Sequence, residues 1–251
     1  MAELKRITEG GYYPYIDLYG DSNALDCDGL IIDAPDQVVI IGQAHIANTR
    51  VPLIVKRCQR LIIGEYLAFN IWGDGAHFRC SHIEIGRYFV AGFIQRFTYE
   101  QWHMDTIFQA FAVKGNGYEP DPDGVLEDIN IPVLESYACI PESNALMLSE
   151  LCQYRDFKIG TRELRVTTAS DYWVNANNLS DSVIGGQSVS IAGIDSESCP
   201  TLLIKNRPKN GIQGCYASGN IHLINIPFLD KASIDCAVAS YGNFELEQGR
   251  H

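Results

Sequence analysis

Residues that could do acid–base chemistry gather in the segment Gln101–Val113, QWHMDTIFQAFAV. A Trp, a His, an Asp and a Gln fall within its first nine residues, and apolar sequence follows directly. An imidazole beside a carboxylate is suited to general acid–base catalysis. An indole ring offers a flat face on which a sugar can stack. Whether these groups act together depends on the element that positions them.

The elements are revealed by short apolar pairs, mostly β-branched, that recur along the chain. They fall at Ile31, Ile40, Ile62, Ile85, Ile107, Ile129, Ile159, Ile184, Ile204 and Ile224. From Ile40 to Ile129 the steps are 22, 23, 22 and 22 residues, and the later steps are 30, 25, 20 and 20. A regular period with strands this short predicts a parallel β-solenoid.

Turn residues follow each apolar pair, which supports short strands joined by bends. Gly recurs at one offset in IIGQ, IIGE, EIGR, KIGT and VIGG, where we expect it to permit a turn with positive φ. The best helical candidate is Pro141–Gln153, PESNALMLSELCQ, although its apolar spacing is ambiguous. The leucine-rich repeat and hexapeptide-repeat folds are not expected, because the chain has neither a ladder of leucines nor a six-residue period.

The period and the strand style resemble the right-handed parallel β-helix, or pectate-lyase-like, family over roughly residues 28–240. The expected fold is therefore all-β, a single-domain right-handed parallel β-helix with roughly 22-residue coils. We expect residues 1–27 to form a lead-in or cap and residues 241–251 a C-terminal tail. The Tyr-rich segment GGYYPYIDLYG would cover the first coil.

Charge and composition exclude several functions. The net charge of −12 would repel a nucleic acid backbone and an anionic membrane surface, so neither is an expected partner. No apolar run is long enough to span a bilayer. The eight cysteines include no CxxC pair, which argues against a zinc cluster, and we expect reduced thiols. We expect no cofactor.

Alternation along the predicted strands places several polar residues on the outside of the coil. His82 and Glu84, Asp128 and Asn130, and Asp156 and Lys158 would all face outward. If Met104, Thr106 and Phe108 face inward, then His103, Asp105 and Gln109 face outward as well. The hypothesis is a column of carboxylates formed by Glu84, Asp105, Asp128 and Asp156, with neighbouring turns about 4.8 Å apart.

Resemblance to β-helix enzymes, in which outward carboxylates on neighbouring turns cleave glycans, implies roles for this column. Asp105 and Asp128 would be the acid and base, with Glu84 and His103 beside them. Expected substrate-binding residues are Tyr99, Trp102, Gln109, Asp156, Lys158 and Arg79. No metal is expected, because the DxDxDG loop is absent. Glycoside hydrolase and polysaccharide lyase chemistry both stay open.

A purely structural interpretation stands beside this one. Solvent-facing strand residues are often charged, and Asp105 could cap a turn. If Ile107 points inward, the column loses its middle member. The turn-rich segment 115–125, GNGYEPDPDGV, would form a loop beside the column.

Within the family, the chain is similar to bacteriophage tailspikes and other virion-associated β-helices, because its lead-in is short and has no apolar leader. This implies a location on the phage tail or capsid exterior, or otherwise the cytoplasm. The expected partners are a bacterial surface polysaccharide and either two copies of the same chain, as a homotrimer, or other virion proteins. The expected function is to bind and cleave that polysaccharide. The alternatives are a non-catalytic virion structural or decoration protein and a cytosolic carbohydrate-active enzyme.

Overall fold

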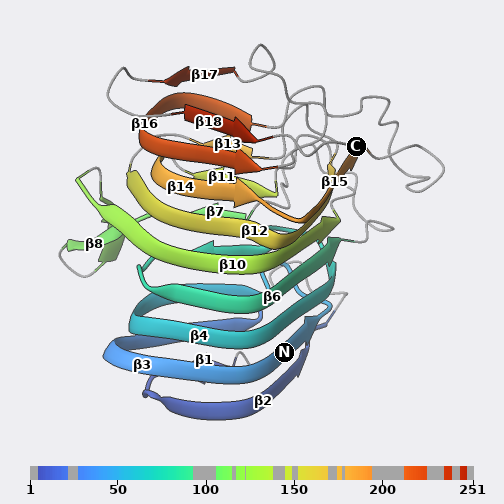
Figure 1. Ribbon diagram of the computed structural model, residues 1–251. Coiled ribbons are helices and arrows are strands. Elements are labelled where there is room, and N and C mark those ends of the chain that lie inside the picture. Colours follow the sequence, from blue (N-terminus) through green and yellow to red (C-terminus); the bar gives the residue numbers. More distant parts are fainter. Residues whose placement is uncertain are drawn as a thin grey trace.

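The chain winds into a parallel β-solenoid, as the sequence predicts. The computed structural model describes residues 5–21, 28–92, 106–114, 117–121, 123–137, 145–148, 152–168, 174–176, 179–193, 212–224, 235–238 and 244–247. These residues contain strands and no helix, and all but two of the strands belong to one continuous sheet. In Figure 1 the near strands run from left to right while successive coils rise, which is a right-handed winding.

Each coil has three sides, and β3 (Leu30–Ala47) and β4 (Leu53–Ile71) run through all of them. The first side also contains β1 (Arg6–Ile7), β5 (Ala76–Phe78), β7 (Thr106–Phe108), β11 (Leu146–Leu148), β13 (Val174–Ala176), the beginning of β16 (Ile212–Ile224) and β17 (Asp235–Val238). The second and third sides contain β2 (Gly11–Tyr19), β6 (Ile83–Gly92), β10 (Val125–Tyr137) and β12 (Gln153–Thr168). The second side adds β14 (Leu179–Gly185), the end of β16 and β18 (Phe244–Glu247), and the third side adds β15 (Ser188–Gly193).

The apolar repeat fills the interior of the coil. Ile41, Ile63 and Ile85 pair in register on neighbouring strands, and each is at most 1% exposed. Ile131 and Ile159 continue the same interior position on β10 and β12. Burying one such side chain contributes about 1.5–3 kcal/mol. The stacked isoleucines therefore both fill the coil and fix its register.

The coil length departs from the expected 22 residues at every step after Glu84. Strands pair at 22-residue steps from Ile40 to Ile62 and on to Glu84, but the next coils pair at steps of 46, 28, 25 and 39 residues. The last step also rules out the expected coil at Ile204, since Ile184 pairs directly with Leu223.

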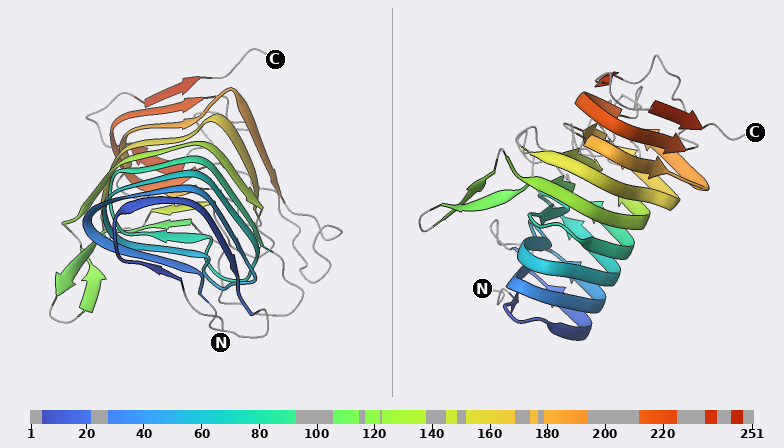
Figure 2. Two further views of the ribbon diagram at one scale, coloured as in Figure 1. Left: turned by 90° about the horizontal axis from the view of Figure 1, so that it is seen from below. Right: turned by 60° about the vertical axis from the view of Figure 1, so that its left-hand side comes forward.

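The 46-residue coil, in which Glu84 pairs with Asn130, contains an insertion. Within this long coil, β8 (Phe111–Lys114) and β9 (Gly117–Pro120) form an antiparallel hairpin. The hairpin projects from the outline of the coil, as both views in Figure 2 show. The predicted loop at 115–125 thus includes one arm of a hairpin.

The expected coil centred on Ile107 is therefore wrong. Thr106–Phe108 pairs with β5 and β11 on the first side of the solenoid, whereas β6 and β10 pair directly with each other. The 22-residue steps on either side of Ile107 were a coincidence of spacing. Ile107 lies on the first side of the coil, whereas Ile85 and Ile129 lie on the second side.

Three other segments differ from expectation. Leu146–Leu148, inside the helical candidate, is strand β11, because Leu146 and Leu148 both enter the core and Leu148 pairs with Phe108. The expected cap includes β1 and β2, which already pair in parallel with β3. The expected tail includes β18, which pairs with β16. Solenoid pairing thus extends beyond both predicted boundaries.

The glycines after the apolar pairs serve two purposes. Gly160 and Gly185 have φ of 64° and 89°, as predicted for turns of positive φ. Gly42, Gly64 and Gly86 instead stack at the corner between the second and third sides. A Cβ added at Gly64 would lie 2.5 Å from the carbonyl oxygen of Gly42. Close approach of neighbouring coils, rather than positive φ, requires glycine there.

We expect Gly64→Ala to destabilise the solenoid by about 1–3 kcal/mol, the usual cost of overpacking, because the added Cβ would meet a backbone carbonyl oxygen that the parallel pairing holds in place. The measurement is the free energy of unfolding in urea. Glu65→Ala, one residue further along, is the control and should change stability by less than about 1 kcal/mol, because it removes a partly exposed ion pair with Arg87 and a hydrogen bond from Gln43. Equal stability of Gly64→Ala and the wild type would contradict this explanation.

Candidate functional site

Four of the predicted site residues lie outside the described residues, namely Tyr99, Trp102, His103 and Asp105. The strand that follows confirms the predicted orientation, because Thr106 and Phe108 are buried and Ile107 is partly exposed. The predicted stacking order is nevertheless wrong. Since β6 and β10 are direct neighbours, no residue of this strand stands between Glu84 and Asp128.

A column of residues with left-handed backbone lies at the corner where the second side begins. His82, Asp128, Asp156 and Asp181 have φ of 61°, 58°, 56° and 47°. Each occupies the same position on β6, β10, β12 or β14, or directly before the strand. Among residues other than glycine, Asp, Asn and His tolerate this conformation best. The repeated acids therefore have a backbone cause that is independent of any catalytic role.

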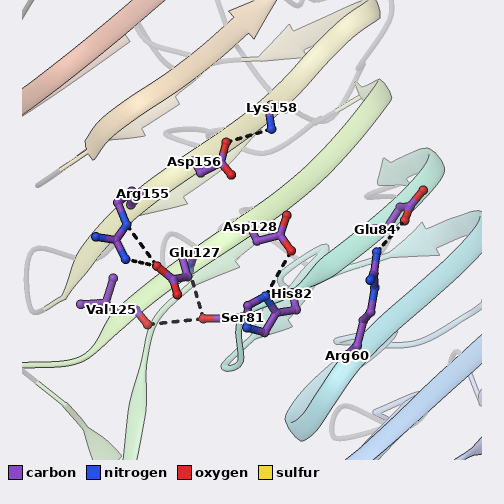
Figure 3. Close-up of polar contacts among 10 residues, drawn as sticks. All are labelled: Arg60, Ser81, His82, Glu84, Val125, Glu127, Asp128, Arg155, Asp156 and Lys158. Carbon is purple, nitrogen blue, oxygen red and sulfur yellow. Dashed lines mark hydrogen bonds and ion pairs between the residues drawn. The ribbon is translucent and has the colours of Figure 1, made fainter.

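Two of these acids, Asp128 and Asp156, are paired with an imidazole and an ammonium group (Figure 3). The Nδ1 atom of His82 lies 3.1 Å from Oδ2 of Asp128, and Nζ of Lys158 lies 2.9 Å from Oδ1 of Asp156. All four side chains are about half exposed. An imidazole that is hydrogen-bonded to a carboxylate can donate a proton to a ligand or take one from it. Pairs this open to water contribute little to stability.

Glu84 belongs to the next outward position along the strands. It stacks with Asn130 and Lys158, two residues after the left-handed column, and Nη2 of Arg60 lies 3.3 Å from its Oε2. We define the second-side polar patch as the residues Arg60, His82, Glu84, Asp128, Asn130, Asp156 and Lys158. The structure thus brings together Glu84, Asp128, Asp156 and Lys158 as expected, although in two columns rather than one. Their proposed roles stay predictions.

Arg79 and Gln109 lie before this patch, at the end of the first side. The guanidinium carbon of Arg79 lies 4.2 Å from the centre of the Phe111 ring, a cation–π contact that links Arg79 to the β8–β9 hairpin. Burial lowers the pKa of Arg79. The backbone N–H of Gln109 donates to the carbonyl of Phe78 over 3.0 Å. Arg79 therefore has a structural contact that competes with its predicted role in substrate binding.

A second group of residues, which the sequence interpretation missed, lies on the third side. Phe69, Phe89 and Tyr137 come from the neighbouring strands β4, β6 and β10. The ring centres of Phe69 and Phe89 are 5.1 Å apart, and those of Phe89 and Tyr137 are 5.5 Å apart. None of the three is buried, and Phe69 is 41% exposed. The rings form an aromatic ladder that runs along the solenoid.

Ion pairs connect the same three strands beside the ladder. Arg87 donates from Nε and Nη2 to Oε2 of Glu135, over 2.9 and 2.8 Å, and from Nη1 to Oε1 of Glu65 over 2.9 Å. The hydrogen bond to Glu135 is the largest cause of a raised pKa at Arg87. Glu135 is only 6% exposed. Arg87 thus ties a nearly buried carboxylate to a more open one.

Tyr137 is part of this network as well as of the ladder. Burial raises the pKa of its hydroxyl, and the charge of Glu135 raises it further, while Arg165 opposes the shift. We define the third-side aromatic patch as Glu65, Phe69, Arg87, Phe89, Glu135 and Tyr137. One sequence pattern could have revealed it. Aligned on their glycines, GEYLAFN at 64–70 and GRYFVAG at 86–92 place Glu65 beside Arg87.

A metal centre finds no support in the part of the chain that the structure describes. Across those residues, no group of three or more His, Cys, Asp and Glu side chains could hold an ion.

The described residues also contain no helix of the length and hydropathy needed to cross a membrane.

We expect Arg87→Met to cost about 1–3 kcal/mol of unfolding free energy, because Glu135 would lose its partner while staying buried. Arg60→Met is the matched control. It breaks the pair with Glu84, in which both side chains are about half exposed, and should cost less than about 1 kcal/mol. Urea unfolding of the two variants measures the difference. Equal costs would show that burial of Glu135 does not set the strength of the network.

Comparison with known proteins gives no relative. No protein-family model, no curated protein and no solved structure matches this chain.

Proposed function

We propose that this protein binds a bacterial surface polysaccharide along the third-side aromatic patch. The observation that carries the proposal is the ladder of Phe69, Phe89 and Tyr137 beside the ion pairs of Arg87. Aromatic rings with partly exposed faces suit stacking against the apolar faces of sugar rings. The ring centres on successive coils are 5.1 and 5.5 Å apart, so a linear polymer along the axis would meet aromatic groups at a nearly regular spacing.

The polar neighbours of the ladder support the same ligand class. Glu65 and Glu135 are held in place by Arg87, and a carboxylate oxygen with a spare lone pair can accept from a sugar hydroxyl. Charge-assisted hydrogen bonds of this kind are stronger than neutral ones. Since Arg87 already fixes both carboxylates, few side chains would need to be ordered when a glycan binds.

Resemblance to the pectate-lyase-like β-helix family, and within it to phage tailspikes, supports a polysaccharide ligand and a virion-associated location. In this proposal the protein lies on the exterior of a phage tail or capsid. Homotrimer formation, or contact with other virion proteins, would cover its ends. The competing proposals are a non-catalytic structural or decoration protein and a cytosolic carbohydrate-active enzyme.

Phe89→Ala should weaken polysaccharide binding by about twofold to tenfold, because one aromatic contact is worth about 0.5–1.5 kcal/mol. Binding would be screened on arrays of capsular polysaccharides and lipopolysaccharide O-chains, and affinity for the best ligand measured by calorimetry. Tyr12→Ala is the control, because Tyr12 is a 67% exposed aromatic side chain that lies on the second side, outside the third-side aromatic patch.

Unchanged affinity of Phe89→Ala, or an equal loss in Tyr12→Ala, would contradict binding at this patch. Absence of binding across the array, with normal assembly into virions, would favour the structural or decoration role.

Cleavage of the same polysaccharide is a second candidate, favoured by one contact on the second side. The bond between His82 and Asp128, with Asp156 on the next rung, offers an imidazole and two carboxylates for acid–base chemistry. New reducing ends would indicate hydrolysis, and absorbance of an unsaturated uronate would indicate elimination.

Asp128→Asn should abolish either product signal while the protein stays folded, because Asn also tolerates positive φ. Asp181→Asn provides a matched control in the same left-handed column, two rungs away, and should retain activity. Full activity in Asp128→Asn would remove this residue from the reaction.

A further inference from the structure

Two cysteines face each other across neighbouring coils. The sulfur atoms of Cys58 and Cys80 are 3.2 Å apart, and both thiols are free. The residues are 22 positions apart in sequence, which is one short coil, and both lie just before the second side begins. Each is partly exposed while it packs against the hydrophobic core. A soluble oxidant can therefore reach the pair.

The backbone around the pair already fits a cross-link. Cys58 lies on β4 and Cys80 in the bend between β5 and β6. The strands on either side of the pair are about 4.8 Å apart, inside the range of about 4.4–6.8 Å found between the Cα atoms of disulfides. Parallel pairing of β4 with β5 and with β6 fixes the two coils on either side of the cysteines. Closing the bond requires the sulfurs to approach, without a rearrangement of strands.

A third cysteine provides a built-in comparison. Cys152 is 1% exposed, and its sulfur accepts from the backbone N–H of Ala110 over 3.1 Å. Counted from the register pair of Phe78 and Phe108, Ala110 occupies the position on the next coil that corresponds to Cys80. Among the residues that the structure describes, Cys152 therefore lies beside an alanine rather than beside another thiol.

We propose that Cys58 and Cys80 are a site of reversible oxidation, at which a disulfide links two neighbouring coils of the solenoid. A small-molecule disulfide such as oxidised glutathione is the oxidant. This inference is independent of polysaccharide binding, and it departs from the expectation that all eight cysteines stay reduced.

The reaction proceeds by thiol–disulfide exchange in two steps. The Cys58 thiolate attacks one sulfur of oxidised glutathione, forms a mixed disulfide and releases one glutathione thiolate, which takes up a proton. Cys80 then loses its proton and attacks the sulfur of Cys58, expelling the second glutathione. Two protein thiols lose two electrons and two protons, and the oxidant becomes two molecules of reduced glutathione.

The local electrostatics assign the order of attack. A hydrogen bond with Cys80 lowers the pKa of Cys58, and the same bond, together with burial, raises the pKa of Cys80. Because the thiolate is the attacking species, Cys58 reacts first and Cys80 resolves the mixed disulfide.

The test uses the folded, full-length protein. Reduced protein is incubated with oxidised glutathione, its remaining thiols are alkylated, and it is digested with trypsin without reductant. Cleavage at Arg57, Arg60, Arg79 and Arg87 releases CQR (58–60) and CSHIEIGR (80–87). We expect these two peptides to be joined, with a mass about 2 Da below the sum of the reduced peptides. Dithiothreitol should separate them again.

Variants distinguish this pair from other thiols. Cys80→Ser should accumulate a glutathione adduct on Cys58, because the resolving thiol is missing, whereas Cys152→Ser should form the cross-link like the wild type. Oxidation should also raise the melting temperature of the wild type and leave that of Cys80→Ser without the same rise. Separate alkylated or glutathionylated peptides from the wild type, or a cross-link that forms only in urea, would overturn the proposal.

Discussion

In-register hydrogen bonding of each coil onto its neighbour is the constraint on which the rest of this structure depends. Once the register is set, a side chain at one position always meets the side chain at the same position one coil away. Isoleucines then stack inside, glycines stack at a corner, and Asn70 donates from Nδ2 to Oδ1 of Asn48 at another corner. The ion pair of Arg87 with Glu65 and the facing cysteines are further columns of this kind. The aromatic ladder is instead diagonal, because Phe69 and Tyr137 pair in register with Ala91 rather than with Phe89. Each in-register column arises because one coil repeats the geometry of the last.

The same constraint explains what could be predicted from the sequence. Alternation and period gave the all-β class, the parallel coil and the inward position of Thr106 and Phe108, because each depends only on local spacing. The 46-residue coil could not be found in this way. Extending a loop costs little free energy, so a solenoid accepts an insertion such as the β8–β9 hairpin without losing its register. A strand within the insertion can then imitate the period by chance, as Ile107 does. Only its pairing partners, His77 and Met147, reveal the side to which it belongs.

The two polar surfaces show why an acidic column is a weak indicator of catalysis in this fold. At the start of the second side the backbone requires positive φ on successive coils, and Asp meets that requirement at Asp128, Asp156 and Asp181. No comparable backbone requirement accounts for the third side, where Glu135 is nearly buried beside partly exposed aromatic rings. A buried carboxylate costs free energy unless it is paired, and Arg87 supplies that pairing. The ion pair of Arg87 with Glu135 and the partly exposed rings are not required by the fold. They therefore favour the third side as the binding surface.

The third-side aromatic patch spans three coils, and the chain segments that connect these coils differ in length. Cys58 and Glu65 lie on β4, and Cys80 and Arg87 belong to the coil that follows. A disulfide between the cysteines would fix the coils that carry Phe69 and Phe89. The next coil, with Glu135 and Tyr137, follows after the long insertion, so chain connectivity restrains it least. Arg87 bridges that junction through two hydrogen bonds to Glu135. Its ion pair therefore holds the ladder together at the step where the repeat is interrupted, and a ligand stacked on Phe89 and Tyr137 would span the same step.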